Sequence, residues 1–484
     1  MTEGRRLAAV VLAAGKGTRM RSETTKVLHP FLGRPMVAWS VEAAFGAGCT
    51  RVAVVVGHQG DAVRHAVIEA FPSRDVVFVE QVTQRGTGDA VRCALPAIEG
   101  CDTLMIISGD TPALDSETLL ALAADHASQS STLTVASFEA ADPTGYGRIV
   151  RDANGTFVRI VEHADATAEE RAITDVNAGL YMAECGPLAD ALASLDSNNA
   201  QGELYVTDAA ALARDAGHHV TAWQLSDPLR VAGVNTRAHL AALEGEVHRR
   251  QIQQRMLDGV TFEAPDSVRV EAQVFIDADT RIGADVELRG ATRIGKRCRI
   301  ERGCVLTDCT VGDDVHIKPY VVGTEAILEH KAIAGPFAHL RPATRLAEGA
   351  KVGNFVETKK TTLGPGSKAN HLTYLGDCEV GRGVNIGAGT ITCNYDGADK
   401  HKTVLEDGVF IGSDTQLVAP VRVGKNATVG AGTTVTRDVP EGALVLSRTA
   451  QREVAGYYEK RRRPREEAKR LKKEATARDA QGAN

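Results

Sequence analysis

The sequence predicts an α/β chain with two domains, a Rossmann-like, doubly wound domain followed by a parallel β-helix of hexapeptide repeats. Two observations predict this combination. Short apolar runs alternate with helical stretches over the first half of the chain, a pattern typical of a mostly parallel sheet covered by helices. From about residue 261 an apolar residue then recurs every six positions, a period that neither an α-helix nor a β-strand produces. In a β-helix each such repeat supplies one inward apolar side chain and one corner.

Length and composition support several domains. At 484 residues the chain is too long for one core, and 43% apolar with 24% charged residues is typical of globular proteins. We expect a first domain over 1–236, a linker helix over 237–260, the β-helix over 261–456 and a tail over 457–484. The tail contains a basic run at 460–473, which is either a contact for an anionic ligand or membrane, or a solvated, disordered end. We favour the disordered end.

Charge and cysteine content exclude several classes of protein. The net charge of −6 gives no general affinity for nucleic acid or membranes, and no segment has the ~18 apolar residues that a membrane helix needs. The apolar run near the N-terminus is short and ends in a glycine loop, so it predicts a buried strand instead of a signal peptide. The nine cysteines include no CxxC pair, which favours reduced thiols, a cytoplasmic location and no zinc site.

The first half supplies the elements of the doubly wound sheet. Strands are expected at 7–13, 52–56, 76–79 and 104–107, with helices at 36–47 and 118–126 among them. Ligands of such sheets bind outside the carboxyl ends of the strands, so the residues that follow each strand are the candidates for chemistry.

A glycine-rich loop follows the first strand. Gly15 and Gly17 allow backbone N–H groups to approach a phosphate, and Lys16 and Arg19 add positive charge. By itself this pattern is as compatible with a simple glycine turn as with a phosphate site. Lys26, a few residues on, is either a second cation of the site or an ordinary surface lysine.

Two further turns carry polar groups. Asp110 ends the strand at 104–107 and is a natural Mg²⁺ ligand, since this ion takes one or two carboxylates and completes its shell with phosphate oxygens and water. An Asp that caps the following turn is the plainer interpretation. The turn at 84–88, with Gln81 before it, could read the edge of a base or sugar, or could simply begin a helix.

Together these motifs resemble the sugar-1-phosphate nucleotidyltransferases. Their order and spacing are more specific than any one of them, and further matching strings occur at 145–149, 160–163, 177–179, 203–208 and 231–235. The resemblance implies that the sheet is a nucleotidyltransferase domain.

In the second half, His371 is the candidate base. It lies between two blocks of the six-residue repeat, and imidazole is suited to general-base work near neutral pH. A lone His is more often structural, but Glu357 is available as a carboxylate to orient the ring. Arg341, Lys359, Tyr374 and Asn385 form a polar set that could bind a phosphosugar, with the Arg341 fork suited to a phosphate. Insertions into the repeat near 324–337 and 393–403 predict loops on a binding face, and the second insertion contains Asn394 and Tyr395.

Long strings at 335–342, 352–360, 367–377, 385–397 and 412–420 resemble the bacterial bifunctional N-acetylglucosamine-1-phosphate uridyltransferases/glucosamine-1-phosphate N-acetyltransferases. The resemblance runs from about residue 7 to 448. It implies a left-handed β-helix that forms homotrimers with acetyl-transfer sites between subunits. The exposed faces of the coils in a single chain support such self-association.

For the β-helix, the resemblance implies transfer of the acetyl group of acetyl-CoA, as co-substrate, to glucosamine 1-phosphate. His371 would accept a proton from the attacking amine, and Asn394 would position that amine. The region of Ser413 would stabilise the oxyanion, at typically ~2.7–4 kcal/mol for each preformed donor. The implied acetyl-CoA-binding residues are Ala388, Asn394, Tyr395, Ser413, Ala431 and Arg448.

For the first domain, the resemblance implies uridylyl transfer from UTP to N-acetylglucosamine 1-phosphate. Mg²⁺ held by Asp110 and Asn235 would bridge the phosphates, and Arg19 and Lys26 would neutralise developing charge. The product is UDP-N-acetylglucosamine, a precursor of cell-wall polymers. The implied nucleotide and sugar contacts are Leu12, Ala13, Ala14, Gly15, Ser108 and Gly109 around the phosphates, Gln81, Gly86 and Thr87 at uracil, and Gly147, Glu162 and Asn177 at the sugar.

Two departures and two alternatives accompany the resemblance. Thr25 stands where the family usually has Pro before the Lys, which predicts a looser Lys26. Tyr457 and Tyr458 stand where Trp is common, so their contact with coenzyme A is open. One alternative is a monofunctional nucleotidyltransferase whose β-helix is a scaffold or binds a regulator. The other is a non-catalytic subunit with both sites decayed, against which the intact Asp110 argues.

Overall fold

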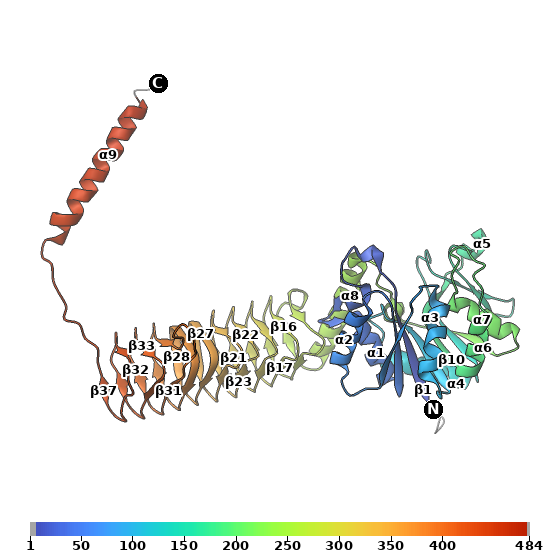
Figure 1. Ribbon diagram of the computed structural model, residues 1–484, viewed down its shortest axis with the longest axis horizontal. Helices are drawn as coiled ribbons and strands as arrows, with labels where there is room; N and C mark the ends of the chain where they lie inside the picture. The colour runs from blue at the N-terminus through green and yellow to red at the C-terminus, as the bar shows by residue number, and fades with distance from the viewer. Residues whose placement is uncertain (1–5, 482–484) are drawn as a thin grey trace. The chain divides into compact units, whose positions relative to one another are not determined.

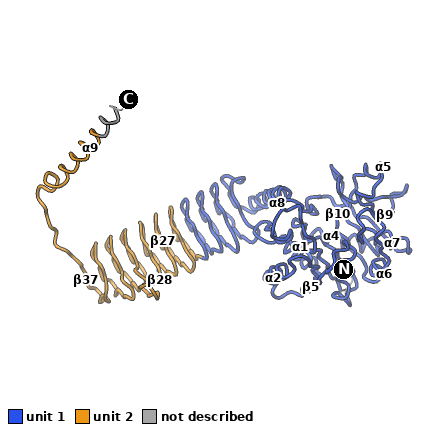
Figure 2. The backbone as a smooth tube through the Cα atoms, turned by 45° about the horizontal axis from the view of Figure 1, so that its top comes forward, with its two compact units in different colours: residues 1–325 blue, residues 326–484 orange. Residues whose placement is uncertain are grey.

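The computed structural model describes residues 6–481, which divide into two compact units, one up to residue 325 and one from 326 onward (Figure 2). The first five residues of the predicted first domain and the last three of the predicted tail lie outside the described residues. The division falls within the repeats, because each coil of a β-helix contacts mainly its neighbours. The domain limits that we inferred from sequence therefore stay a prediction.

A mixed sheet with the order β11-β7-β10-β6-β1-β4-β5 forms the centre of the first unit (Figure 1). Strand β10 runs antiparallel to β6 and β7, while the other pairs along this order are parallel. Strands β8 and β9 form an antiparallel pair that joins β10. The bounds are β1 Leu7–Ala13, β4 Arg51–Val56, β5 Val76–Glu80, β6 Thr103–Ser108, β7 Leu133–Glu139, β8 Arg148–Arg151, β9 Phe157–Val161, β10 Asp175–Glu184 and β11 Val220–Gln224.

Helices cover both faces of this sheet and enclose two separate cores. Because side chains alternate along a strand, Ala9 and Val11 of β1 join one core, while Ala8 and Val10 join the other. All four side chains are fully buried. This arrangement confirms the predicted doubly wound fold. The first core is covered by α1 (Met36–Gly46), α2 (Gly60–Ala70) and α4 (Ser116–Ser128), and the second by α3 (Thr87–Ala94), α6 (Cys185–Ala193) and α7 (Val206–Asp215).

A third, smaller core joins the loops around the carboxyl ends of the strands to α8 (Arg237–Leu257). It contains Met20, Leu32, Val234 and Leu243, and Ala272 of the first coils packs against it. Met20 and Val234 adjoin predicted site residues in the chain, so the core fixes the backbone near the site. The short elements here are η1 (Thr18–Met20), η2 (Lys26–Leu28), β2 (Pro30–Phe31), β3 (Arg34–Pro35) and η4 (Pro228–Val231), and elsewhere η3 (Leu95–Ile98) and α5 (Ala168–Arg171).

The repeats form the predicted parallel β-helix. Within the first unit, Ile282 of β15 (Arg281–Ile282) pairs with Ile300 of β18 (Arg299–Ile300), and Ile300 pairs with Ile317 of β21 (His316–Ile317). A coil therefore closes after 17 or 18 residues, which equals about three of the predicted hexads. All three isoleucines point inward and are buried. The strands of the first unit run from β12 (Thr261–Phe262) to β22 (Val322–Thr324).

The second unit continues the same type of coil with two long strands. Strands β27 (Lys351–Leu363) and β28 (Lys368–Val380) pair in parallel over almost their whole length. The other strands that bear on the site are β25 (His339–Leu340), β29 (Asn385–Ile386), β30 (Ile391–Cys393), β31 (Thr403–Leu405), β32 (Phe410–Ile411), β33 (Gln416–Val418) and β37 (Leu444–Val445).

Corners of the coils adopt the left-handed backbone conformation, and most of them carry Asp or Gly, which tolerate it. In the second unit three large apolar residues also adopt this conformation, Phe337, Phe355 and Leu372, with φ values of 53°, 56° and 41°. Their side chains are 49%, 57% and 63% exposed, and the two phenylalanine rings stack with centroids 5.6 Å apart. We call these three residues the apolar corner. Bulky residues are costly in this conformation, so the apolar corner is an unusual feature of the surface.

The tail differs from the disordered end expected from sequence. It contains a turn of π-helix (Tyr458–Arg462) and α9 (Arg463–Gln481). Ion pairs four residues apart support the helix, with Arg463 bonded to both Glu459 (2.8 Å) and Glu467 (3.1 Å). The Tyr458 hydroxyl donates to Glu466 within the tail itself.

All nine cysteines lie among the described residues 6–481, and none of them forms a disulfide there. Among residues 6–481, no helix combines the length and the hydrophobicity that a membrane span requires.

Two candidate active sites

The carboxyl ends of β1 and β6 form the floor of the first candidate site. Leu12 and Ala13 end β1, Ala14 and Gly15 follow it, and the Gly109 N–H donates to the Leu12 carbonyl across the two strand ends (2.9 Å). The backbone therefore brings Leu12, Ala13, Ala14 and Gly15 beside Ser108, Gly109 and Asp110, as the parallel register of β1 and β6 requires.

Four charged and polar side chains that were predicted for this site, and that lie far apart in the sequence, meet at this floor. Lys26 forms an ion pair with Asp110, and Arg19 Nη2 donates to Asn235 Oδ1 (2.8 Å). The Lys26 Nζ atom also lies 3.4 Å from Asn235 Oδ1. The Val234 N–H donates to the Asp110 carbonyl (3.0 Å), which fixes Asn235 beside the end of β6.

The same oxygens can hold a divalent cation. The Asp110 carboxylate and the Asn235 amide oxygen both face the Lys26 ammonium. The two oxygens thus already accept hydrogen bonds from one positively charged group. Hard cations such as Mg²⁺ prefer this ligand set and take their remaining ligands from phosphate and water. The described residues contain no group of three His, Cys, Asp or Glu side chains spaced for a metal, so such an ion depends on its substrate for further ligands.

Thr25 holds the loop before Lys26 in a way that Pro could not. Its backbone N–H donates to Gln59 Oε1 (2.8 Å), and Gln59 Nε2 donates back to the Glu23 carbonyl (2.6 Å). Thr25 is only 2% exposed. Hydrogen bonds here replace the stiffness of a proline ring, so the structure gives no sign of the looser Lys26 that sequence suggested.

The predicted base-reading turn is also assembled. Gln81 is buried, and its amide nitrogen donates to the Gly86 carbonyl (3.1 Å) and to Asp89 Oδ2 (3.0 Å). Its Oε1 remains as a hydrogen-bond acceptor. The Thr87 hydroxyl accepts from the Val206 N–H (3.1 Å), which ties the turn to α7.

Gly147, Glu162 and Asn177, the predicted sugar contacts, lie together. A methyl group on Gly147 would lie 3.5 Å from both Glu162 Oε1 and Asn177 Cβ, and 2.9 Å from Ile160, so a larger residue would crowd this wall. The Asn177 side chain is oriented by donation to the Tyr181 hydroxyl (2.7 Å).

Glu162 lies in an acidic environment. Its Oε1 accepts from the Thr207 hydroxyl (3.0 Å), and it lines a cavity of about 350 Å³ with Asp165 and Asp208. Burial, with smaller contributions from Asp208 and Asp165, raises the pKa of Glu162 above its ordinary value. Burial also raises the pKa of Asp208.

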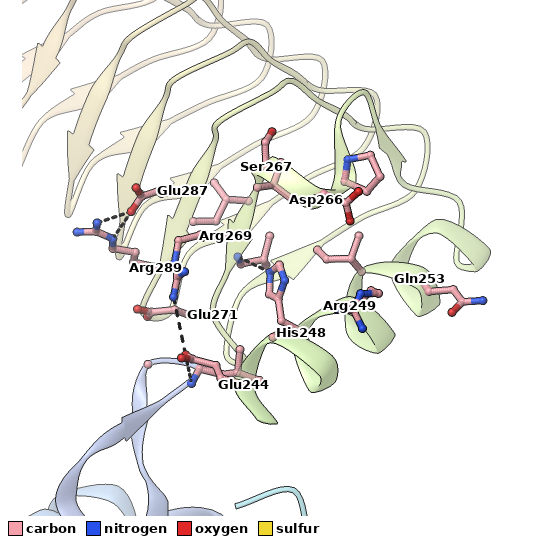
Figure 3. A pocket seen from close by; sticks show the side chains of 18 of the residues that line it. Glu244, His248, Arg249, Gln253, Asp266, Ser267, Arg269, Glu271, Glu287 and Arg289 are labelled. Atoms are coloured by element: carbon pink, nitrogen blue, oxygen red, sulfur yellow. Dashed lines mark hydrogen bonds and ion pairs between the residues drawn. The ribbon is translucent and has the colours of Figure 1, made fainter. Parts of the chain in front are cut away.

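A cavity of about 1030 Å³ in the first unit is separate from these residues. It lies between α8 and the first coils, and none of the predicted site residues lines it (Figure 3). The Val270 N–H donates to His248 Nε2 across it (3.1 Å), and Glu244 accepts from the Leu32 N–H (2.9 Å). Through the first of these hydrogen bonds, residues that line the cavity hold α8 against the coils.

In the second unit, His371 lies at the predicted insertion face but with a different partner. Its Nδ1 atom lies 2.8 Å from Asn354 Oδ1, because the parallel register of β27 and β28 sets residue 371 opposite residue 354. Glu357 lies opposite Tyr374 and instead accepts from Arg341 Nη1 (2.7 Å). The expected orientation of His371 by Glu357 is therefore corrected, since Glu357 lies three residues further along the strand.

Positive charge gathers around Arg341, the partner of Glu357. The ammonium groups of Lys359 and Lys400 are in contact, and Arg341 is also close. This contact with Lys400, with a smaller effect from Arg341, lowers the pKa of Lys359. Three adjacent cations are a natural phosphate site.

Tyr374 and Asn394 converge over Gly376. A methyl group on Gly376 would lie 2.5 Å from the Tyr374 hydroxyl and 2.8 Å from Asn394 Nδ2, so glycine is required there. Asn394 is 8% exposed, and its Nδ2 donates to Asp377 Oδ2 (2.6 Å).

Three of the residues expected to bind acetyl-CoA form a column on successive coils. The Asp414 N–H donates to the Ala388 carbonyl (2.7 Å), and the Gly432 N–H donates to the Ser413 carbonyl (2.8 Å), which sets Ala388, Ser413 and Ala431 one above another. Asn385 lies on β29, Tyr395 is exposed on the second insertion, and Arg448 is exposed beyond β37. No hydrogen bond or ion pair within residues 6–481 joins Arg448 to this column.

Sequence reasoning missed Asn354, Asp377, Thr207 and Lys400. Asn354 lies one 17-residue coil before His371, so counting coils would have found it. Lys400 lies in the second insertion, whose fold no repeat pattern specifies.

Comparison with protein families agrees with both halves. Residues 9–260 match the MobA-like NTP transferase domain. Residues 402–437 match the bacterial transferase hexapeptide, and residues 273–308 match the hexapeptide repeat of succinyl-transferase.

Curated relatives cover nearly the whole chain. It is 49% identical over 447 residues to a bifunctional protein GlmU of Pelobacter propionicus. The matched residues cover 92% of this chain and 96% of that relative. A bifunctional protein GlmU of Sorangium cellulosum is 50% identical, over 93% of this chain and 96% of its own length. One from Alkalilimnicola ehrlichii is 48% identical, over 95% and 97%.

Proposed function

This chain belongs to the family of bifunctional GlmU proteins, and from this membership we propose how its two sites divide the synthesis of one sugar nucleotide. The chain is an enzyme with two transferase activities. Its left-handed β-helix N-acetylates glucosamine 1-phosphate with acetyl-CoA, and its nucleotidyltransferase domain joins N-acetylglucosamine 1-phosphate to UTP with release of pyrophosphate. A β-helix that serves only as a scaffold does not fit relatives that match both halves and are bifunctional by name.

In the acetyl-transfer site, we assign His371 as the base that takes the proton from the amine of glucosamine 1-phosphate as the amine attacks the thioester. The hydrogen bond to Asn354 holds the ring, because a bond at one ring nitrogen sets the orientation of the other. The sugar phosphate would bind Arg341, Lys359 and Lys400, whose mutual repulsion an anion relieves.

The remaining groups of this site have supporting roles. Asn394 would position the amine, since Asp377 fixes its amide and Tyr374 adjoins it at Gly376. Ser413 would contribute to oxyanion stabilisation. The column Ala388, Ser413 and Ala431 leaves space for the pantetheine arm of acetyl-CoA. Asn385, Tyr395 and Arg448 complete the proposed contacts, with Arg448 facing a coenzyme phosphate.

In the uridylyl-transfer site, the sugar phosphate attacks the α-phosphorus of UTP in line and pyrophosphate leaves. Such chemistry depends mainly on positioning and charge neutralisation. Arg19 and Lys26 are already held at the floor of the site by Asn235 and Asp110, so their charge is in place before the substrate binds. Residues 12–15 and 108–109 would approach the nucleotide with backbone groups.

A divalent metal is required by this class of nucleotidyltransferase, and we propose Mg²⁺ held by Asp110 and Asn235. A bound ion would supply charge neutralisation at the phosphates. Lys26 is paired with one oxygen of the Asp110 carboxylate, and the ion would take that oxygen as a ligand. Lys26 would then turn towards the phosphates.

Base and sugar selection follow from the hydrogen-bonding groups that remain. Because both N–H groups of Gln81 are used within the protein, its Oε1 would accept the N3–H of uracil, which cytosine lacks. Gly86 and Thr87 would contact the same base. Glu162 and Asn177 would hold the N-acetylglucosamine moiety against Gly147.

We further propose a homotrimer located in the cytoplasm. The apolar corner adjoins His371 and would be covered by a second copy, as expected for acetyl-transfer sites between subunits. The nine cysteines, none of which forms a disulfide within residues 6–481, agree with a reducing compartment. Neither nucleic acid nor an integral membrane association has a place in this scheme.

The cluster of Arg19, Lys26, Asp110 and Asn235 is the observation that carries the assignment of the first site. The test is to assay one preparation for both reactions. We expect thiol release from acetyl-CoA with glucosamine 1-phosphate, and pyrophosphate release from UTP with N-acetylglucosamine 1-phosphate. A chelator should stop the second reaction, Mg²⁺ should restore it, and thiol release should continue throughout. No thiol release from the wild-type protein would refute the acetyltransferase assignment.

A further inference from the structure

The second insertion, residues 394–402 between β30 and β31, has almost no buried surface to order it. Residues 395–400 are all exposed, so burial of apolar groups contributes little to its conformation. Its two ends are bonded to neighbouring coils through Asn394 to Asp377 and Lys402 to Glu379, so the exposed part between them is ordered by polar contacts within the loop.

Asp396 makes most of those contacts. Its Oδ1 accepts from the backbone N–H groups of Ala398 and Asp399 (2.8 Å each), and its Oδ2 lies 2.6 Å from His401 Nε2. These hydrogen bonds hold the pKa of Asp396 well below its usual range. Asp396 is thus a charged centre to which the turn and the return of the loop are both attached.

The two ends of the loop are closed by backbone pairing. The His401 N–H donates to the Asn394 carbonyl (2.8 Å), and Tyr395 pairs with Lys400 in an antiparallel bridge. This pairing fixes Lys400 on the returning side of the loop, next to His401.

Lys400 is held where its charge is unfavourable. Its ammonium lies against that of Lys359, and Arg341 lies close by, so the loop adds a third cation to a cluster whose one printed ion pair is that of Arg341 with Glu357. A flexible exposed lysine would swing away into water to escape this repulsion. The geometry therefore needs a device that opposes the repulsion, and the Asp396–His401 pair is the one that the loop contains.

We propose that Asp396 and His401 form a clamp that positions Lys400 for the phosphate of the sugar phosphate. Both are positioning residues, because they act through Lys400 and touch no substrate. Two nearby carboxylates already have partners, since Glu357 is bonded to Arg341 of the cluster and Asp377 to Asn394. The inference rests on the proposed acetyltransferase function, and it adds that this loop sets the affinity for the phosphate group.

The test compares Asp396→Ala, Lys400→Met and the double variant in the full chain. Asp396→Ala should raise KM for glucosamine 1-phosphate by about ten-fold, as expected for the loss of charge-assisted hydrogen bonds. Its KM for acetyl-CoA and its uridylyl transfer should stay at the wild-type level. In the Lys400→Met background the same change should have no further effect on KM, because the group that the clamp positions is gone.

Conservative variants separate the clamp from general damage to the loop. Asp396→Asn keeps an oxygen for the two backbone N–H groups but loses the charge opposite His401, so it should raise KM less than Asp396→Ala. His401→Ala should match Asp396→Asn. Asp399→Ala is the matched control and should change nothing, since that carboxylate makes no hydrogen bond or ion pair within residues 6–481.

Two results would overturn the proposal. One is an unchanged KM for glucosamine 1-phosphate in Asp396→Ala. The other is a further rise in KM when Asp396→Ala is added to Lys400→Met, because Asp396 would then act on something besides Lys400. Failure of the proposed function is distinguishable from both, since wild-type protein would then release no thiol from acetyl-CoA.

Discussion

The two sites are built in opposite ways. In the nucleotidyltransferase site, Lys26 and Asp110 are mostly shielded, with side chains 15% and 20% exposed, and the groups that meet there span residues 19 to 235. In the β-helix, His371 is exposed and its partner Asn354 lies one coil away. A doubly wound sheet gathers distant segments and closes a site by itself. A solenoid brings together only neighbouring coils, so its site stays open on the outer face and must be closed by a loop or by another chain.

The largest expected effect separates the two chemistries. His371→Ala should lower kcat for acetyl transfer by about 10²–10⁴-fold, the range for loss of a general base. Uridylyl transfer should be unaffected because no group of that site depends on the coil. Thiol and pyrophosphate release by one preparation would measure both. Normal acetylation by the variant would show that another group is the base.

The reverse experiment uses the charge cluster. Lys26→Met keeps the length of the side chain but removes its charge, and should lower kcat for uridylyl transfer by roughly 10²–10³-fold. Acetyl transfer should remain at the wild-type rate. Equal losses in both reactions would instead indicate that the variant is misfolded, which circular dichroism would detect.

The open side of the β-helix site can be tested through the apolar corner. Replacing both Phe355 and Leu372 by Ser should dissociate the proposed trimer, since each buried side chain of this kind contributes about 1.5–3 kcal/mol. Sedimentation velocity would report the loss of mass, and acetyl transfer should fall while uridylyl transfer persists. Leu471→Ser is the control, because Leu471 is comparably exposed (59%) on α9. A monomeric wild-type protein would contradict the premise.

The smallest effect concerns Glu162. Its pKa in the folded protein is raised, so the stability that its protonated form provides is present below the unfolded pKa and is lost as pH rises through the folded pKa. Glu162→Gln removes this loss and should raise the melting temperature by roughly 2 °C at pH 7. At pH 4 the difference should disappear. A lower melting temperature for the variant than for wild type at pH 7 would show that the charged Glu162 carboxylate stabilises the folded protein.

Much of the fold could be predicted, because local patterns specify it. The apolar run at 7–13 became β1 with those bounds, and the six-residue period became inward residues such as Ile282 and Ile300. The family match also named most of the groups that the structure brings together. Register was harder, because the apolar pattern does not specify which polar residues of neighbouring coils lie opposite one another. The 17-residue spacing of β27 and β28 sets Asn354 opposite His371, while Glu357 lies opposite Tyr374. Lys400 could not be placed, because the loop that carries it is ordered by Asp396 and not by burial.

The closure of coils after 17 or 18 residues in the first unit also bears on how such a protein can evolve. The coils between residues 287 and 325 carry none of the proposed catalytic or binding residues, and in the first unit strands bond to the equivalent strand of the next coil. An in-frame duplication or loss of one such coil preserves the corner pattern and the inward residues of those that remain. Gene rearrangements can therefore lengthen or shorten the solenoid while both active sites are inherited intact, a freedom that the doubly wound domain, with its interleaved strand order, does not have.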